Sequence, residues 1–194
     1  MALFAARLYR AGMLAVPAES ALLLPVPAAE SAVAHHRAHL DVSAWDGVPA
    51  HITVLYPFLP PAAIDAEALA SVRRLIAGFP AFDFELDRIG WFGDSVTWLG
   101  PRDPAPFRSL TDAAFAAFPS CPPYGGQHDD VIPHLTIGHR GGTDALRQAA
   151  ADVSVRLPIR ARAAEVILMT GPRPGDGPGP PAQWHTSAAF RLGE

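Results

Sequence analysis

Two short stretches decide how the chain folds: residues 51–58 read HITVLYPF, and residues 134–140 read HLTIGHR. Each begins with a histidine, has a threonine two positions later, and carries apolar residues between and after them. Alternating apolar and β-branched residues predict strands, and successive side chains of a strand point to opposite faces. We therefore expect two strands, each with its histidine and threonine on one face and its apolar residues in a core.

This alternation places His51 with Thr53 on the first strand and His134 with Thr136 on the second. Displacement at phosphorus needs a base for the attacking oxygen and an acid for the leaving oxygen, and two histidines can divide these roles near neutral pH. The threonine hydroxyls can donate hydrogen bonds to phosphate oxygens. One His-x-Thr in a strand is common by chance. A matched pair, with a proline one or two positions before each histidine, predicts a phosphate site that needs no metal.

HITVLYPF and HLTIGHR resemble the two signature motifs of the 2H phosphoesterases, specifically the 2′-5′ RNA ligase-like branch, and the resemblance spans about residues 21–192. It implies a bilobal α+β fold with two antiparallel sheets and flanking helices around a pseudo-twofold cleft, one motif on each wall. Members hydrolyse 2′,3′-cyclic phosphates, and some reversibly join RNA ends by a 2′-5′ bond. The resemblance implies His51 and His134 as the catalytic pair and Thr53 and Thr136 as phosphate ligands. Opening to a 2′-phosphate would make His134 the base and His51 the acid.

Four further residues are candidate substrate ligands. Tyr56 lies five positions after the first histidine, where relatives carry an aromatic residue that can stack on a base. Strict alternation would place Tyr56 on the opposite face from that histidine unless the strand bends, for example at Pro57. Family members often carry arginine five positions after the second histidine, where this chain has His139 followed by Arg140. Tyr124 precedes the second motif and either borders the cleft or packs on the surface.

Composition excludes several kinds of chemistry. All 15 basic residues are arginine, so a lysyl-adenylate, a P-loop lysine and a lysine Schiff base are excluded within this sequence. The net charge of -4 argues against an extended basic groove for duplex DNA. The chain has no run of 18 apolar residues, so we expect no membrane span. Its single cysteine, Cys121, excludes an internal disulfide and suits a reducing compartment.

Two other clusters resemble metal sites. His35, His36 and His39 contain an i, i+4 pair on an expected helix, and residues 128–130 read HDD, similar to the metal-binding pair of another, largely helical phosphohydrolase class. Neither cluster has further ligands at a convincing spacing. A solvated helix face and a polar loop are the better interpretations, so we expect neither a metal nor a cofactor.

The rest of the chain predicts alternating helices and strands. Strands are expected at residues 21–27, 51–58, 82–91, 95–99, 134–138, 156–170 and 183–192, and helices at 28–40, 65–77, 104–118 and 143–153. Gly93-Asp94 would join a hairpin, and residues 119–133 and 171–181 would form loops. Residues 1–20 are expected to be a loose leader, with Met13 as an alternative start. Residues 21–194 would form a single bilobal domain.

These observations predict a metal-independent cyclic phosphodiesterase. We expect a cytoplasmic monomer that acts in RNA processing or on small nucleotides, with a cyclic nucleotide or a cyclic-phosphate RNA terminus as its partner. One alternative is a 2′-5′ RNA ligase that joins pre-existing cyclic-phosphate ends without ATP, because no lysine can be adenylated. Another is a non-catalytic nucleotide- or RNA-binding module on the same fold. Retention of both histidines and both threonines counts against that module.

Overall fold

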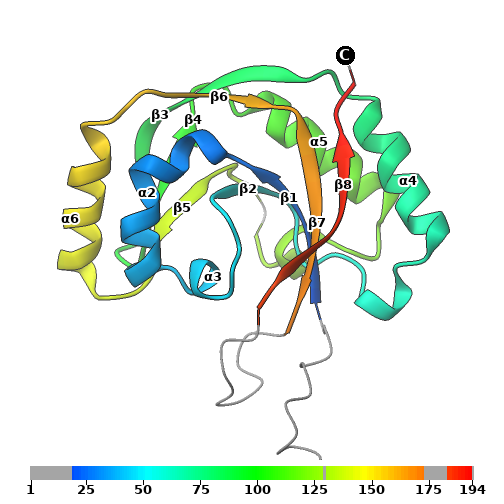
Figure 1. Ribbon diagram of the computed structural model, residues 1–194, viewed down its shortest axis with the longest axis horizontal. Helices are drawn as coiled ribbons and strands as arrows, with labels where there is room; N and C mark the ends of the chain where they lie inside the picture. The colour runs from blue at the N-terminus through cyan, green and yellow to red at the C-terminus, as the bar shows by residue number, and fades with distance from the viewer. Residues whose placement is uncertain (1–18, 129, 173–182, 194) are drawn as a thin grey trace, which may run out of the picture.

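The protein has the expected α+β architecture, with two antiparallel four-stranded sheets (Figure 1). The computed structural model describes residues 19–128, 130–172 and 183–193. Within them, the strand order is β2-β1-β7-β8 in one sheet and β5-β4-β3-β6 in the other. The strands are β1 (Glu19–Pro25), β2 (His51–Leu55), β3 (Phe82–Phe92), β4 (Val96–Pro101), β5 (Leu135–Gly138), β6 (Ile159–Ala163), β7 (Glu165–Gly171) and β8 (His185–Arg191).

Helices flank both sheets. In Figure 1, α2 and α6 lie to one side of the molecule, and α4 and α5 lie to the other. The α-helices are α2 (Pro27–Leu40), α3 (Val42–Trp45), α4 (Ala66–Ala77), α5 (Ala105–Ala117) and α6 (Thr143–Ser154). Two single turns of 3₁₀-helix, η1 (Pro61–Ala63) and η2 (Pro123–Gly126), interrupt the loops. Among the described helices, none combines the length and apolar composition needed to cross a bilayer.

The two halves of the chain repeat one arrangement, β1-α2-β2-α4 and then β4-α5-β5-α6. In each half the strand that carries or directly follows the motif histidine pairs antiparallel with the strand before it and stands at the end of its sheet. The helix between these two strands crosses to the other lobe. As a result α2 packs on β5 and β6, whereas α5 packs on β2. The two motifs therefore occupy equivalent positions in two lobes that share their helices.

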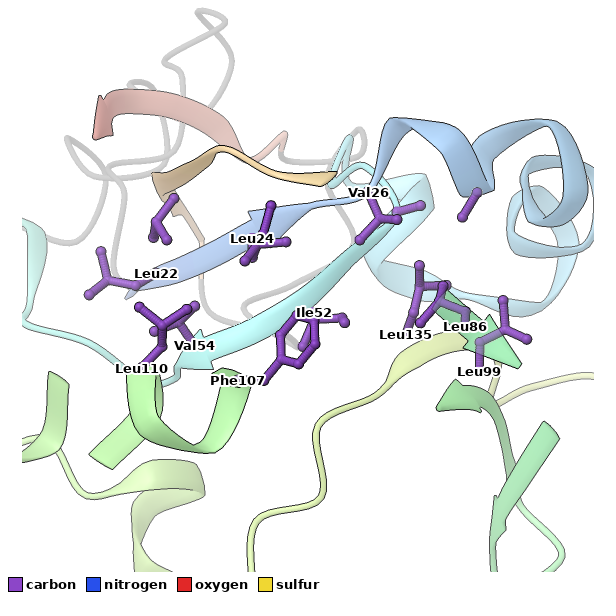
Figure 2. Close-up of a cluster of buried hydrophobic side chains, with 14 of the residues drawn as sticks. Leu22, Leu24, Val26, Ile52, Val54, Leu86, Leu99, Phe107, Leu110 and Leu135 are labelled. Carbon is purple, nitrogen blue, oxygen red and sulfur yellow. The ribbon is translucent and has the colours of Figure 1, made fainter. Parts of the chain in front are cut away.

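One hydrophobic core extends through both lobes. The apolar residue between histidine and threonine in each motif, Ile52 or Leu135, is fully buried in it. Figure 2 shows Ile52 near Phe107, Val54 near Leu110, and Leu135 grouped with Leu86 and Leu99. The motif histidines and threonines, by contrast, stay partly exposed. The expected alternation of faces is thus confirmed for both strands.

Most expected elements are present with ends shifted by a few residues, but the single strand at residues 156–170 was wrong. The chain there forms β6 in one sheet and β7 in the other, with Ala164 between them. The Ala164 carbonyl accepts a hydrogen bond from the Leu192 amide, 2.9 Å away. A continuous β-type sequence does not reveal this change of sheet, because strand partners are non-local. The helical turn α3 was also missed.

Parts of three expected features lie outside the described residues. They are the leader up to residue 18, the proline- and glycine-rich loop from residue 173 to residue 182, and Asp129 of the HDD stretch. The hairpin at Gly93-Asp94 is confirmed, since β3 and β4 pair antiparallel on either side of it.

We predict that Ile52→Ala lowers the free energy of unfolding by about 2–5 kcal/mol, because it leaves a cavity in the shared core. Val155, 83% exposed, provides the matched control: Val155→Ala should change stability by no more than about 0.5 kcal/mol. Urea unfolding followed by circular dichroism measures both. Equal effects of the two substitutions would contradict the placement of Ile52.

Candidate functional site

The two motif histidines are held in the same way. His51 Nδ1 lies 2.8 Å from the carbonyl oxygen of Pro49, and His134 Nδ1 lies 2.7 Å from the carbonyl oxygen of Ile132. In both cases the acceptor belongs to the residue two positions earlier. A carbonyl can only accept, so Nδ1 must carry the hydrogen. The other ring nitrogen, Nε2, then accepts a proton when the imidazole is neutral and donates one when it is protonated.

The fold brings these two imidazoles close together. Strands β2 and β5 come into contact although they belong to different sheets. A positive charge on His134 lowers the pKa of His51, so the two rings are within electrostatic reach of each other. His51 and His134, which the sequence predicted as a pair, therefore lie near each other where the two lobes meet.

Burial shifts both histidines toward their neutral form. Burial is the main cause that lowers the pKa of His51 to about 4; the charge of Arg37 adds to this lowering, and the hydrogen bond to Pro49 opposes it. Burial also lowers the pKa of His134, again opposed by the bond to its carbonyl partner. Both rings are thus mainly neutral at pH 7. Two neighbouring titratable groups with shifted pKa values are typical of catalytic sites.

The two threonines accompany the histidines. Thr53 and Thr136 each lie two residues after the histidine, on the same face of the chain. The phenol of Tyr124 hydrogen-bonds Thr53, and burial raises the pKa of Tyr124, which keeps the phenol protonated. Thr136 stands opposite Trp98 in the register of β4 and β5. The sequence left two places open for Tyr124, at the border of the cleft or on the outer surface. The structure has Tyr124 at the border of the site, beside Thr53.

Tyr124 holds this position through an uncommon backbone conformation. Its φ is +51°, in the left-handed region, where a bulky residue costs free energy and is found mostly at functional positions. Its amide donates to the carbonyl of Tyr56, 2.6 Å away, which ties the loop to the end of β2.

A β-bulge decides where Tyr56 points. The pairing of β1 with β2 shifts by one residue between Thr53 and Leu55, so Val54 is extra on its strand. Val54 and Leu55 are both buried in the core, and alternation then returns Tyr56 to the face of Thr53. The bulge at Val54 therefore brings Tyr56 to this face, and no bend of the strand at Pro57 is needed.

The environment of Tyr56 is aromatic and partly polar. Its hydroxyl donates to Glu19 Oε2 at 2.7 Å, and its ring centroid lies 6.4 Å from that of Trp184. Both rings pack on a small apolar cluster next to β2, made of Ala21, Leu23, Val48, Ile167 and Met169. Tyr56 is therefore part of the wall beside the first motif.

His139 and Arg140, the last two residues of the second motif, lie in different places. His139 lines a pocket beside His134, and its Nδ1 lies 3.5 Å from Asp41 Oδ1. Arg140 is exposed, with its guanidinium 5.9 Å from the centre of the Trp45 ring. The structure thus brings His139 to the site but not Arg140.

A pocket of about 700 Å³ adjoins His134, a size typical of small-molecule sites. The tip of the β3–β4 hairpin and the loop before β5 enclose it, and its lining includes Phe92, Tyr124, His128 and Ile132. The Phe92 ring meets the His134 ring edge-on, with centroids 4.9 Å apart. The second histidine therefore stands at the rim of an aromatic pocket.

Three residues near the site were not found from the sequence: Arg37, Asp41 and Trp98. Arg37 is 3% exposed and lies on the buried stripe of α2, between Val33 and Leu40. Its Nε bonds Asp41 Oδ2 at 2.9 Å. The sequence feature that could have indicated this buried pair is an arginine on the apolar stripe of a helix with an aspartate four residues later. Trp98 is buried, and the centroid of its ring lies 5.9 Å from that of His134.

The described residues contain no group of three or more His, Cys, Asp or Glu side chains arranged to hold a metal. His35 and His39 are exposed on α2, and their ring centroids are 5.2 Å apart. In the HDD stretch, His128 contacts the ring of Tyr124, and Asp130 lies 3.4 Å from Arg108.

Comparisons with known proteins agree with this architecture. Two solved structures of similar fold are E. coli LigT complexed with 3′-AMP (18% identity, TM-score 0.57) and TT0787 of Thermus thermophilus (17% identity, TM-score 0.58). The first match covers 92% of this chain and 100% of LigT, and the second covers 91% and 99%. No curated protein matches the sequence. The family model described as "2′-5′ RNA ligase superfamily" matches residues 24–174. The chain therefore belongs to the 2′-5′ RNA ligase superfamily of 2H phosphoesterases.

Proposed function

We propose that the protein is a metal-independent phosphodiesterase that hydrolyses 2′,3′-cyclic phosphates on small nucleotides or RNA ends. The observation that carries this proposal is the matched pair of imidazoles, each fixed through Nδ1 by a backbone carbonyl. Membership of a phosphoesterase and ligase family supports an enzyme of this general kind. A module that only bound nucleotides would have no need of two partly buried imidazoles with Nε2 left for proton transfer.

In the proposed reaction, a neutral histidine takes a proton from water, and the water oxygen attacks phosphorus. The bond from phosphorus to O3′ breaks, and the second, protonated histidine gives its proton to O3′. The products are a 2′-phosphate and a 3′-hydroxyl. Thr53 and Thr136 would donate hydrogen bonds to the non-bridging oxygens, where negative charge increases in the transition state.

The pKa of about 4 favours His51 as the base and leaves His134 as the acid in the proposed reaction. A group with a pKa of about 4 is mainly neutral at any pH well above that value, as a base must be. His134 is then the imidazole that must be protonated. This assignment reverses the division that the family resemblance implies, and it rests on the burial and the arginine charge around His51.

The pocket beside His134 is the proposed site for the nucleoside of the substrate. Solved structures of LigT contain 3′-AMP, ATP and NADP⁺, which supports a nucleotide as the ligand of this fold. Phe92 and Tyr124 offer ring surfaces in a volume of about 700 Å³.

The family description also favours a second activity, 2′-5′ ligation of RNA. The same two histidines would serve it, with the oxygen of a 5′-hydroxyl replacing water as the group that attacks phosphorus. Incubation of cyclic-phosphate RNA with a 5′-hydroxyl RNA separates the two activities. A joined product without ATP indicates ligation, and a terminal 2′-phosphate indicates hydrolysis.

We predict that His51→Ala and His134→Ala each lower kcat on a hydrolysed cyclic phosphate by about a hundredfold to ten-thousandfold, the usual effect of one positioned acid or base. The double variant should lose little more, because both groups act in one step. Conversion of 2′,3′-cyclic nucleotides and RNA oligomers to their 2′-phosphates, resolved by chromatography, measures the rates. His35→Ala, on the exposed face of α2, is the control. Near-normal turnover in both single variants would disprove the mechanism.

We predict a bell-shaped pH profile of kcat/KM with its maximum between about pH 4 and pH 6.5. The base must be deprotonated, so the rate rises with pH through the low pKa of about 4. The acid must be protonated, so the rate falls as pH passes a pKa that lies below the ordinary value of 6.5. The limbs belong to the coupled pair. A maximum above pH 7.5 would contradict the burial-lowered pKa values.

We predict that excess chelator leaves the rate unchanged, because proton transfer between the histidines and the substrate uses protein groups alone. Dialysis against EDTA followed by assay, with and without added Mg²⁺, Mn²⁺ or Zn²⁺, is the measurement. Loss of activity that one of these metals restores would favour a metal-assisted reaction.

A further inference from the structure

The backbone just before His51 is held by two charged side chains of α2. Arg37 Nη2 donates to the carbonyl of Val48 at 3.1 Å, and Glu30 Oε1 accepts the amide hydrogen of Ala50 at 2.7 Å. These two bonds flank Pro49, whose carbonyl receives the hydrogen of His51 Nδ1. Proline has no amide hydrogen, so its carbonyl is the only backbone hydrogen-bonding group of that residue.

The main chain completes this arrangement. The Val48 amide donates to the Ser43 carbonyl at 2.9 Å, and the Ala50 carbonyl accepts from the Val26 amide at 2.8 Å. Every backbone donor and acceptor of Val48 and Ala50 therefore has a partner. The peptide planes on both sides of Pro49 are fixed, which fixes the direction of its carbonyl.

Arg37 is itself anchored in the interior. Its Nε bonds Asp41 Oδ2 at 2.9 Å, and both side chains are buried, with 3% and 2% of their surfaces exposed. Asp41 also accepts from the Ser43 amide at 3.0 Å. A buried ion pair with its remaining groups hydrogen-bonded has little freedom to move, so it can transmit a fixed geometry to its neighbours.

The same aspartate reaches the second motif strand. His139, in the turn after β5, lies 3.5 Å from Asp41 Oδ1, and its amide donates to the Leu40 carbonyl at 2.8 Å. The end of α2 thus contacts the segment before β2 and the segment after β5. It is placed to set how the two motif strands lie relative to each other.

We propose that Glu30 and Arg37 are positioning residues for His51: they orient the Pro49 carbonyl, which holds the imidazole in its Nδ1–H tautomer with Nε2 toward the substrate. This inference deepens the proposed function and rests on it for its catalytic meaning. His134 takes its carbonyl from Ile132, on a different segment that neither Glu30 nor Arg37 is seen to hydrogen-bond.

The test begins with Glu30→Leu, because Glu30 is 38% exposed and its replacement should leave the fold intact. Nitrogen-15 NMR of the ligand-free protein reports the tautomer of each histidine. The parent should show Nδ1–H at both His51 and His134. In Glu30→Leu the His51 signals should shift toward a mixture of tautomers, while His134 stays unchanged as an internal reference.

Kinetics give the second readout. Glu30→Leu should lower kcat about tenfold to a hundredfold with KM within about twofold, as expected when a reacting group is misplaced without loss of binding. Glu30→Gln should retain the parent rate and tautomer, because its amide oxygen can still accept from Ala50. Arg37→Lys keeps the charge but loses the planar fork, so it should resemble Glu30→Leu. Glu67→Leu, at an exposed position on α4, is the control.

An unchanged His51 tautomer and an unchanged kcat in both Glu30→Leu and Arg37→Lys would overturn the inference. So would an equal change at His51 and His134, which would indicate a general loosening of the fold. The tautomer is measured without substrate. If the parent protein hydrolyses no cyclic phosphate, the proposed function is refuted. The tautomer measurement would still decide whether Glu30 and Arg37 position His51.

Discussion

Burial of Ile52 and Leu135 in one continuous core is the constraint on which the site depends. A strand that carries a buried apolar residue between two polar ones cannot slip by a single position, because the slip would expose the apolar side chain and bury the polar pair. Since both strands are held against the same core, their polar faces are fixed relative to each other as well. The directions of His51 and His134 follow from hydrophobic packing, and the polar interactions only refine them.

That refinement is largely electrostatic. Two imidazoles placed against apolar and aromatic walls lack the hydration that would stabilise their protonated form, so the site favours the neutral form of both. A phosphate bound as proposed would bring a negative charge next to the rings and offset this cost for one of them. On this view the substrate itself helps to create the proton donor. The site would then be fully assembled only when the anion is present.

The sequence predicted those features that depend on local periodicity. Alternation in HITV and HLTI was enough to place the histidines and threonines on one face, and the family resemblance supplied the two sheets. Features that depend on strand partners could not be predicted in this way. The extra residue Val54 arises from pairing with β1, and the change of sheet at Ala164 arises from pairing with distant strands. Arg37 was overlooked because charge normally marks an exposed helical face, and only its spacing to Asp41 indicated otherwise.

The exchange of α2 and α5 between the lobes has a consequence for how the molecule holds together. Each sheet is covered in part by a helix that the other half of the chain contributes. Neither half contains a complete lobe, so opening one lobe removes apolar cover from the other and the two should melt in one cooperative transition. A fragment that ended between β3 and β4 would keep the first histidine but lose the helix that packs on its strand. The two halves of the chain should therefore not separate as independent domains, because each motif strand packs against a helix from the half that carries the other motif.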